Sequence, residues 1–476
     1  MTDVTADKTG ASASPGAEGQ SFGSFGYRTY VLLTLTVVYT FNFIDRILIS
    51  VVGRPIIDEF GLSNFQFGIL SGLGFALFYT LLGIPIATLS ERVSRVRIIG
   101  VCVILWSVAT VLCGFTVGFF TLLLARLAVG VGEAGCTPPA NSLISDYYKP
   151  ISRPTALGIY AIGITAGGVL AQVGGGWMLE NFTWRQAFIY VGAPGVIIGL
   201  IVLLTIKEPP RGYSDPAGTT KPERASFSDA FAEVVSKRTF WMVVIASTFC
   251  AFAGYSLVGF QPLHIQYTHG YSAGETAIRF MALFGIAGSL GAFLGGWLTE
   301  RANRFSATAA CWVPGIALIL CGPIYFFGFQ VAGVTLMFIA MFAANLVQYT
   351  YLGAQYNISQ AVVSLRVRAT SVAIFLFVVN LIGYGLGPPT FGLIADGLTN
   401  SWINSSEFAG QITATCSLTD DSLGETLLAA CLDAKAHGIR WACSYATLLF
   451  SVAGIFFVLT GRTFVADVAS ARAKGA

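Results

Sequence analysis

Twelve predominantly apolar segments of about 20 residues recur along this 476-residue chain and constrain its fold more than any other feature. A helix of about 20 residues is as long as a hydrocarbon core of about 30 Å is thick. Only 11% of the residues are charged, against about 25% in soluble domains, so the chain cannot cover a water-facing surface. The predicted spans are 29–53, 66–89, 98–118, 120–143, 155–178, 186–206, 239–262, 276–299, 307–329, 331–356, 369–395 and 440–462.

The distribution of Lys and Arg predicts how these spans are oriented. With twelve spans, both chain ends lie on one side of the membrane. Twenty of the 27 basic residues fall on that side and five on the other, and the remaining two are Arg46 and Arg126 inside spans. Loops rich in Lys and Arg stay in the cytoplasm. We therefore expect a multi-pass protein of the cell inner membrane with both termini cytoplasmic, and no nucleic-acid partner at a net charge of +3.

Two long connections divide the chain. The one at 207–238 is rich in Pro and Gly, which is typical of a linker, and Ser228–Lys237 is expected to form a short amphipathic helix. The other holds Cys416 and Cys431, and whether they form a disulfide stays open at this stage. The predicted organisation is a disordered cytoplasmic tail at 1–26, a six-helix bundle at 27–206, a cytoplasmic linker at 207–238, a six-helix bundle at 239–463 with an outer loop at 396–439, and a cytoplasmic tail at 464–476.

An internal repeat relates the two halves. Residues 87–95 read ATLSERVSR and residues 296–304 read GWLTERANR, so Leu, Glu, Arg and Arg recur at an offset of 209. Arg153-Pro-Thr recurs as Arg368-Ala-Thr at an offset of 215. Duplicated six-helix halves are the architecture of an alternating-access transporter. Its expected cytoplasmic gate comprises Glu91, Arg92, Arg95, Glu300, Arg301 and Arg304, and positive-inside anchoring is the alternative role.

Four charged residues lie inside the predicted spans, namely Asp45, Arg46, Arg126 and Glu133. Charge near a bilayer centre is costly and usually marks a transport pathway. Counting about 1.5 Å per residue from the span ends places Asp45 level with Arg126 and allows Arg46 to reach Glu133. A guanidinium partner is the condition for burying a carboxylate at tolerable cost. A fixed charge network without a transport role is the alternative.

The residue types suggest separate roles. We expect Asp45 and Glu133 to couple transport to protons, because a carboxylate that loses its Arg partner takes up a proton. Arg46 or Arg126 would hold an anionic group, with Asn42 on the same helix face as Arg46. The second half offers polar and aromatic side chains in place of charge, and the alternative is that these serve helix–helix contacts. The candidates there are Asn345, Gln348, Tyr349 and Asn380.

These motifs resemble a known family. The pattern G-x-L-x-[D/E]-R-x-G-R after the second and eighth spans is the signature of the major facilitator superfamily, although Ala87 and Ser94 replace its two glycines in the first copy. The runs 42–46 (NFIDR), 130–134 (GVGEA) and 208–212 (EPPRG) together resemble the Spinster family. The resemblance implies two pseudo-symmetric bundles of twelve transmembrane helices in all, working as a monomer without metal or cofactor, and a transporter rather than an enzyme.

The same resemblance implies a substrate class. Spinster proteins are associated with movement of lysophospholipids and sphingosine phosphate, so the expected substrate is an amphiphilic anionic lipid moved together with protons. The alternative is proton-coupled symport of small organic anions such as sugar acids. A second half that is apolar and aromatic, in a chain with 37 Phe residues, favours the lipid.

Overall fold

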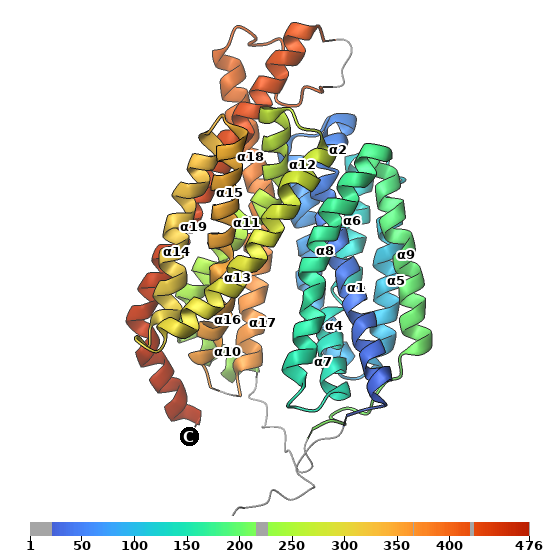
Figure 1. Ribbon diagram of the computed structural model, residues 1–476, viewed down its shortest axis with the longest axis vertical. Coiled ribbons are helices and arrows are strands. Elements are labelled where there is room, and N and C mark those ends of the chain that lie inside the picture. The colour runs from blue at the N-terminus through green and yellow to red at the C-terminus, as the bar shows by residue number, and fades with distance from the viewer. Residues whose placement is uncertain (1–20, 216–226, 365, 419–422, 476) are drawn as a thin grey trace, which may run out of the picture.

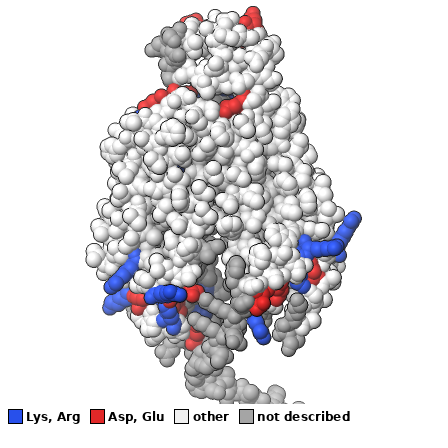
Figure 2. Space-filling model, turned by 180° about the vertical axis from the view of Figure 1, so that it is seen from behind, with Lys and Arg blue, Asp and Glu red and all other residues white. Residues whose placement is uncertain are grey.

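The structure is a computed structural model that describes residues 21–215, 227–364, 366–418 and 423–475. Within these residues every regular element is a helix, and twelve helical segments are long and apolar enough to cross a membrane. The all-α membrane fold predicted from the apolar segments is therefore confirmed. On the face that Figure 2 shows, a broad uncharged band lies across the molecule, with Lys and Arg gathered near one end.

The spans form two bundles that lie side by side, an N-terminal half and a C-terminal half (Figure 1). The N-terminal half contains α1 (Phe25–Val51), α2 (Gly53–Phe60), α3 (Asn64–Gly68), η1 (Ile69–Leu73), α4 (Gly74–Ser90), α5 (Arg95–Cys113), α6 (Phe119–Glu133), α7 (Thr137–Tyr147), α8 (Arg153–Asn181) and α9 (Trp184–Thr205). The C-terminal half contains α10 (Phe227–Val235), α11 (Arg238–His269), α12 (Ala273–Thr276), η2 (Ala277–Met281), α13 (Ala282–Ala302), α14 (Ala309–Gln330), α15 (Val334–Gln348), η3 (Tyr349–Tyr351), α16 (Leu352–Ala361), α17 (Arg368–Val378), η4 (Val379–Gly385), α18 (Leu386–Ser405) and α19 (Glu425–Gly475).

The two ends of the molecule differ. We call the end that carries the start of α1 and the end of α19 the terminal face, and the opposite end the distal face; the terminal face is at the bottom of Figure 1. Hydrogen bonds and ring contacts join the halves near the distal face. Asn64 at the start of α3 donates to Asp396 of α18, and the rings of Phe67 and Phe260 lie 5.5 Å apart.

Glycines let the helices approach closely, as membrane bundles require. A Cβ atom on Gly167 of α8 would lie 2.5 Å from the carbonyl oxygen of Thr40 on α1, so only glycine fits at this crossing. On α6, Gly132 lies equally close to the backbone of Trp106 on α5. At these two crossings the helices of the first bundle pack closely because one partner has no side chain.

Helices extend beyond several boundaries expected from the sequence. The expected outer loop at 396–439 is helical at both ends, because α18 continues to Ser405 and α19 already begins at Glu425. The expected tail at 464–476 is also largely helical, since α19 reaches Gly475. Apolar composition marks only the part of a helix that crosses the bilayer, and a helix rich in Ala and Leu can continue into water. Residues 1–20 and 216–226 of the expected tail and linker lie outside the described residues.

Two smaller features of the chain are present in the structure. The amphipathic helix expected within the linker is α10, which begins at Phe227 and ends at Val235. The question left open for the outer connection is answered by a disulfide between Cys416 and Cys431. Beside it, Ile403, Ile412 and neighbouring apolar side chains form a small separate core above the C-terminal half.

Candidate functional site

Four charged side chains from α1 and α6 gather inside the N-terminal half. Asp45 is buried, Arg126 and Glu133 are 0% exposed, and only the side chain of Arg46 is slightly open, at 13%. Arg126 and Glu133 are seven residues apart on α6 and therefore share one face of that helix. Asn42, four residues before Arg46 on α1, is also fully buried. The helix face that Asn42 and Arg46 were expected to share thus points into the bundle.

Arg46 lies between a carboxylate and several aromatic rings. Its Nε donates a hydrogen bond of 2.7 Å to Oε2 of Glu133, so the predicted pairing of these two residues is confirmed. The guanidinium carbon is 4.4 Å from the ring centroid of Tyr79 and 4.8 Å from that of Phe75. A charge-assisted hydrogen bond and ring faces together stabilise a cation in a low-dielectric site.

Asp45 and Arg126 form a looser pair. Nη1 of Arg126 is 3.7 Å from Oδ1 of Asp45, which confirms the predicted pairing but exceeds a hydrogen-bonding distance. Both oxygens of Asp45, all three guanidinium nitrogens of Arg126 and both amide atoms of Asn42 are buried without a hydrogen-bond partner in the structure. Buried polar atoms are nearly always hydrogen-bonded. This corner of the site therefore has unused capacity to bind an anion, a proton or water.

Aromatic rings lead from Arg46 into the C-terminal half. Phe75 lies 5.2 Å from Tyr79 and 5.6 Å from Tyr384, which belongs to η4 of the other half. Tyr384 in turn stacks on Tyr255 of α11 at 4.0 Å. Phe75 and Tyr79 were not singled out from the sequence. Two aromatic residues four apart in the second span, level with a buried Arg, were the available signal.

The amides predicted in the C-terminal half already have partners there. Oε1 of Gln348 accepts from the hydroxyl of Tyr325 at 2.8 Å, and Nδ2 of Asn345 donates to the carbonyl oxygen of Met341 at 2.9 Å. Tyr349 packs against Gly288 and leaves no room for a Cβ atom there. These contacts stabilise the bundle. A role of Asn345, Gln348, Tyr349 and the half-buried Asn380 in substrate binding stays a prediction.

At the terminal face Arg95 is enclosed by its own half. Its Nη1 is 2.5 Å from Asp146 and its Nε is 2.6 Å from Glu208, and Nη2 donates to the carbonyl oxygen of Pro209. Glu208 also accepts from the backbone N–H of Val96. The motif around 91–95 and the Glu-Pro-Pro run are thereby joined in one cluster, which holds the start of α5 against the end of the bundle.

The other predicted gate residues lie on the surface of the terminal face. They are exposed near the ends of corresponding helices, α4 in the first half and α13 in the second. Their positions agree with the repeat, whereas their action as a gate stays a prediction. The residues concerned are Glu91, Arg92, Glu300, Arg301 and Arg304.

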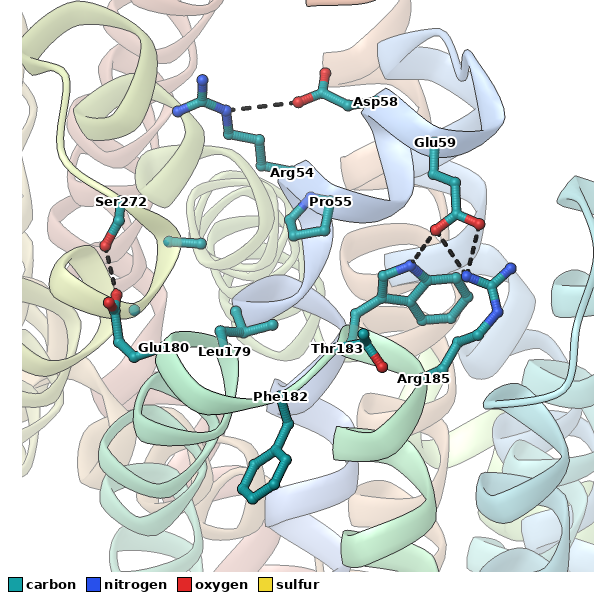
Figure 3. Close-up of a pocket in the computed structure, with 13 residues that line it drawn as sticks. Arg54, Pro55, Asp58, Glu59, Leu179, Glu180, Phe182, Thr183, Arg185 and Ser272 are labelled. Atoms are coloured by element: carbon teal, nitrogen blue, oxygen red, sulfur yellow. Dashed lines mark hydrogen bonds and ion pairs between the residues drawn. The ribbon is translucent and has the colours of Figure 1, made fainter. Parts of the chain in front are cut away.

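A hollow of about 600 Å³ opens at the distal face, between the halves (Figure 3). Its charged groups are largely paired within the N-terminal half. Glu59 accepts from Nε1 of Trp184 at 2.6 Å and from Nη1 of Arg185 at 2.7 Å, and Arg54 lies 3.6 Å from Asp58. The lining residues are Arg54, Pro55, Asp58, Glu59, Leu179, Glu180, Phe182, Thr183, Trp184, Arg185, Ser272, Ala273 and Gly274.

Two bundles of six spans with buried charge between their helices define a membrane transporter. The family profile of the Major Facilitator Superfamily matches residues 35–388, and the chain belongs to that superfamily. It is accordingly a transporter and not an enzyme.

Within the superfamily the chain is related to the Spinster proteins. It is 42% identical to a bacterial homologue of the human lysosomal transporter Spinster, solved in an inward-facing and unoccupied conformation, with 94% of this chain and 99% of the other covered at a TM-score of 0.84. It is 25% identical to Protein spinster of Drosophila melanogaster over 92% of this chain and 77% of the relative. It is also 30% identical to an MFS-type efflux pump of Mycolicibacterium smegmatis, over 77% of this chain and 84% of the relative.

Proposed function

We propose that this protein moves an amphiphilic anionic lipid, such as a lysophospholipid or a sphingosine-phosphate-like molecule, across the cell inner membrane by proton-coupled alternating access. The observation that carries the proposal is the position of Arg46. It has a carboxylate partner on one side and a series of aromatic rings leading into the C-terminal half on the other. An anionic headgroup and an apolar chain require these two environments next to each other.

The buried pairs supply a route for coupling. When a substrate phosphate takes the guanidinium of Arg46 or Arg126, the carboxylate that loses its partner is left in a low-dielectric site. An unpaired buried carboxylate is strongly disfavoured, so Glu133 or Asp45 takes up a proton. Asp45 is the first candidate, because its 3.7 Å ion pair is the looser of the two and has no hydrogen bond to break.

The faces of the molecule fit the same proposal. Lys and Arg gather near the terminal face. Because loops rich in these residues stay in the cytoplasm, the terminal face is the cytoplasmic one. The exposed charges at the ends of α4 and α13 then form the cytoplasmic gate, and the fold works as a monomer. The relation to Spinster proteins supports a lipid as the substrate class.

The test is proton flux in proteoliposomes on addition of a lysophospholipid, with a sugar acid as the comparison substrate. We expect the lysolipid to drive flux in the parent and the Asp45→Asn variant to lose it. Glu59→Gln is the matched control, because Glu59 is a distal carboxylate that is paired with Arg185 away from the buried cluster. Its flux should equal that of the parent.

A response to the sugar acid alone would overturn the lipid assignment. The specific observation that favours this second function is the unused hydrogen-bonding capacity of Arg126, which suits a small carboxylate as well as a phosphate. The aromatic rings around Arg46 would then serve packing only. Lysolipid-driven flux that survives in Asp45→Asn would move the coupling role from Asp45 to Glu133.

A further inference from the structure

The second and eighth spans begin in the same way at the distal face. Ser63 caps α3 and forms a reciprocal capping box with Gln66, and Ser272 caps α12 in the same arrangement with Glu275. The two boxes are 209 residues apart, the same offset that relates the charged motifs at the terminal ends of these spans. A π-helical turn follows each cap, η1 in the first half and η2 in the second. The whole element is therefore duplicated, from one face to the other.

The helices that face these starts are also duplicated. In α8 the sequence Gly176-Trp-Met-Leu-Glu180 places an acid four residues after a glycine, and in α18 Gly392-Leu-Ile-Ala-Asp396 does the same. The offset between the two is 216, one more than the 215 that relates the starts of these spans. The π-helical η4 lies between the start and the acid in the eleventh span, whereas α8 is α-helical throughout. A π-turn accommodates one extra residue and so brings Asp396 to the position that Glu180 occupies in the first half.

Each acid reaches the start of a span in the opposite half. Asp396 accepts from the backbone N–H of Asn64 at 3.0 Å, from Nδ2 of Asn64 at 2.8 Å and from the backbone N–H of Phe65 at 3.0 Å. Glu180 accepts from the hydroxyl of Ser272 at 2.6 Å, as Figure 3 shows. Each contact thus crosses the boundary between the two halves.

The glycine of each element allows the contact. A Cβ atom on Gly176 would lie 2.9 Å from the carbonyl oxygen of Gly274, which no ordinary packing permits. A Cβ atom on Gly392 would collide with the carbonyl group of Asn64. In each helix the glycine and the acid are one turn apart and contact the same partner segment. The glycine allows the two backbones to approach closely, and the carboxylate binds the partner segment by hydrogen bonds.

We propose that Asp396 and Glu180 are twin latches that keep the distal face of the transporter closed. As positioning residues of the transport cycle, they set how often the distal face opens without touching the substrate. If the halves rock against each other, both sets of contacts must break before the distal face can open. This inference rests on the alternating-access part of the proposed function and adds to it the residues that hold one of the two states.

The two latches are unequal. Asp396 holds three donors, and two of them belong to the buried Asn64, so these two charge-assisted hydrogen bonds are partly shielded from bulk water. Glu180 holds one hydroxyl, and both it and Ser272 are exposed, where such contacts contribute little. The Asp396 latch therefore contributes most of the stabilisation of the closed distal face.

The test measures distances between pairs of spin labels in the full-length protein by electron–electron double resonance. One pair, at Val117 and Ala332, reports on the distal face, and the other, at Ile151 and Phe305, on the terminal face; all four sites are exposed loop or helix-end positions. The variants are Asp396→Asn, Glu180→Gln and their combination. Glu59→Gln is the matched control, because its hydrogen bonds to Trp184 and Arg185 stay within one half.

We expect Asp396→Asn to raise the ratio of distal-open to distal-closed molecules about tenfold, as loss of hydrogen bonds to a charged group predicts. The distal distance should lengthen while the terminal distance shortens. Glu180→Gln should have a smaller effect, and Glu59→Gln none. Unchanged distances in the combined variant would overturn the proposal. So would an equal shift in Glu59→Gln, or lengthening of both distances, which would indicate loosening of the fold.

Failure of the latch and failure of the proposed function give different results. The latch is tested by comparing the labelled variants without substrate, and lysolipid is added to the labelled parent in a separate measurement. Suppose that lysolipid changes both distances in the parent while the Asp396→Asn substitution changes neither. In that case alternating access stands and the latch assignment is wrong. If lysolipid leaves the parent distances unchanged while Asp396→Asn shifts them, the latch stands and the substrate assignment is wrong.

Discussion

Arg46 joins a charged environment and an aromatic one at a single residue. Its Nε donates a hydrogen bond to Glu133, while its guanidinium carbon lies 4.4 Å from the ring centroid of Tyr79. Lys would keep the charge but neither the fork nor the planar face. At the residue scale, the site therefore depends on the shape of the guanidinium and not only on its charge.

We accordingly predict that Arg46→Lys weakens the apparent affinity for lysolipid about tenfold, which corresponds to roughly 1.4 kcal/mol. The KM of lysolipid-driven proton flux measures this. Arg54→Lys is the matched control, since Arg54 also lies over a ring, that of Tyr267 at 5.1 Å, but near the distal face. A KM that changes equally in both variants, or in neither, would contradict a binding role for Arg46.

Asp58, outside the spans on α2, gives a prediction about pH. Burial raises the pKa of Asp58 above its ordinary value, and Lys435 and Arg54 offset that effect only in part. A carboxyl with a raised pKa in the folded state contributes stability below its unfolded pKa of about 3.9 and loses that contribution as pH rises through its folded pKa. Asn at this position cannot titrate. The melting temperature of Asp58→Asn minus that of the parent should therefore rise between pH 4 and pH 8, by roughly 1–3 °C.

Thermal unfolding in detergent across this pH range checks the prediction. Glu59→Gln, at the neighbouring position, is the control, because its carboxylate is paired with Arg185 and half-exposed. A difference between Asp58→Asn and the parent that falls as pH rises would mean that the positive charges of Arg54 and Lys435 outweigh burial.

At the scale of elements, the glycines of α8 and α18 test whether the distal contacts need close approach. Gly392→Ala should open the distal face, because overpacking against the backbone of Asn64 costs about 1–3 kcal/mol. Gly397→Ala is the matched control on the same helix, since nothing lies within 4 Å of its added Cβ. The spin-label distances across the distal face measure both variants.

The control should keep the parent distances and gain up to about 1 kcal/mol of stability, as replacement of a helical glycine by Ala predicts. The same pair can be made on α8 with Gly176→Ala and Gly174→Ala, because a Cβ on Gly174 also meets nothing within 4 Å. Equal distances in Gly392→Ala and Gly397→Ala would show that the crossing tolerates a side chain and that the glycine is not part of the latch.

The elements also show what a sequence can and cannot predict. Apolar segments predicted twelve spans, and counting residues along α1 and α6 predicted which carboxylate meets which guanidinium. Both follow from regular helix geometry. The offset between corresponding residues of α8 and α18 changes by one residue along these spans. The sequence alone does not explain this change, because π-turns such as η4 carry no clear sequence signal.

Other parts of the site depend on tertiary contacts that a single sequence does not reveal. In the sequence, nothing distinguishes Phe75 and Tyr79 from other aromatic residues of a span. Their role becomes visible only in the structure, where Arg46 lies against both rings. The gate role of Arg95 stays a prediction, but the sequence did not reveal that Asp146 and Glu208 of its own half enclose this residue. Long-range partners decide the role of a charged residue, and those partners lie about 50 and 110 positions away in the chain.

At the scale of the whole molecule, the asymmetry of charge predicts its orientation. Lys and Arg gather near the terminal face (Figure 2), so this face should be cytoplasmic. Single cysteines at Val117, on the distal face, and Ile151, on the terminal face, form a matched pair of exposed loop positions in the same half. A membrane-impermeant thiol reagent should label Val117→Cys in intact cells and Ile151→Cys only after lysis. Labelling in the opposite order would reverse the orientation.

The disulfide offers a check on orientation that does not depend on charge. Cys416 and Cys431 lie on the distal face, and the seven other cysteines are free and buried or half-buried. Disulfides persist on the oxidising side of a membrane, which is the periplasmic side if the protein lies in the inner membrane as we propose. Protein from cells, denatured without reductant, should therefore bind seven polyethylene-glycol maleimides, and nine after reduction. Nine without reduction would place the distal face in a reducing compartment. Positive-inside bias and disulfide formation would then disagree, and the direction assigned to both gates would have to be inverted.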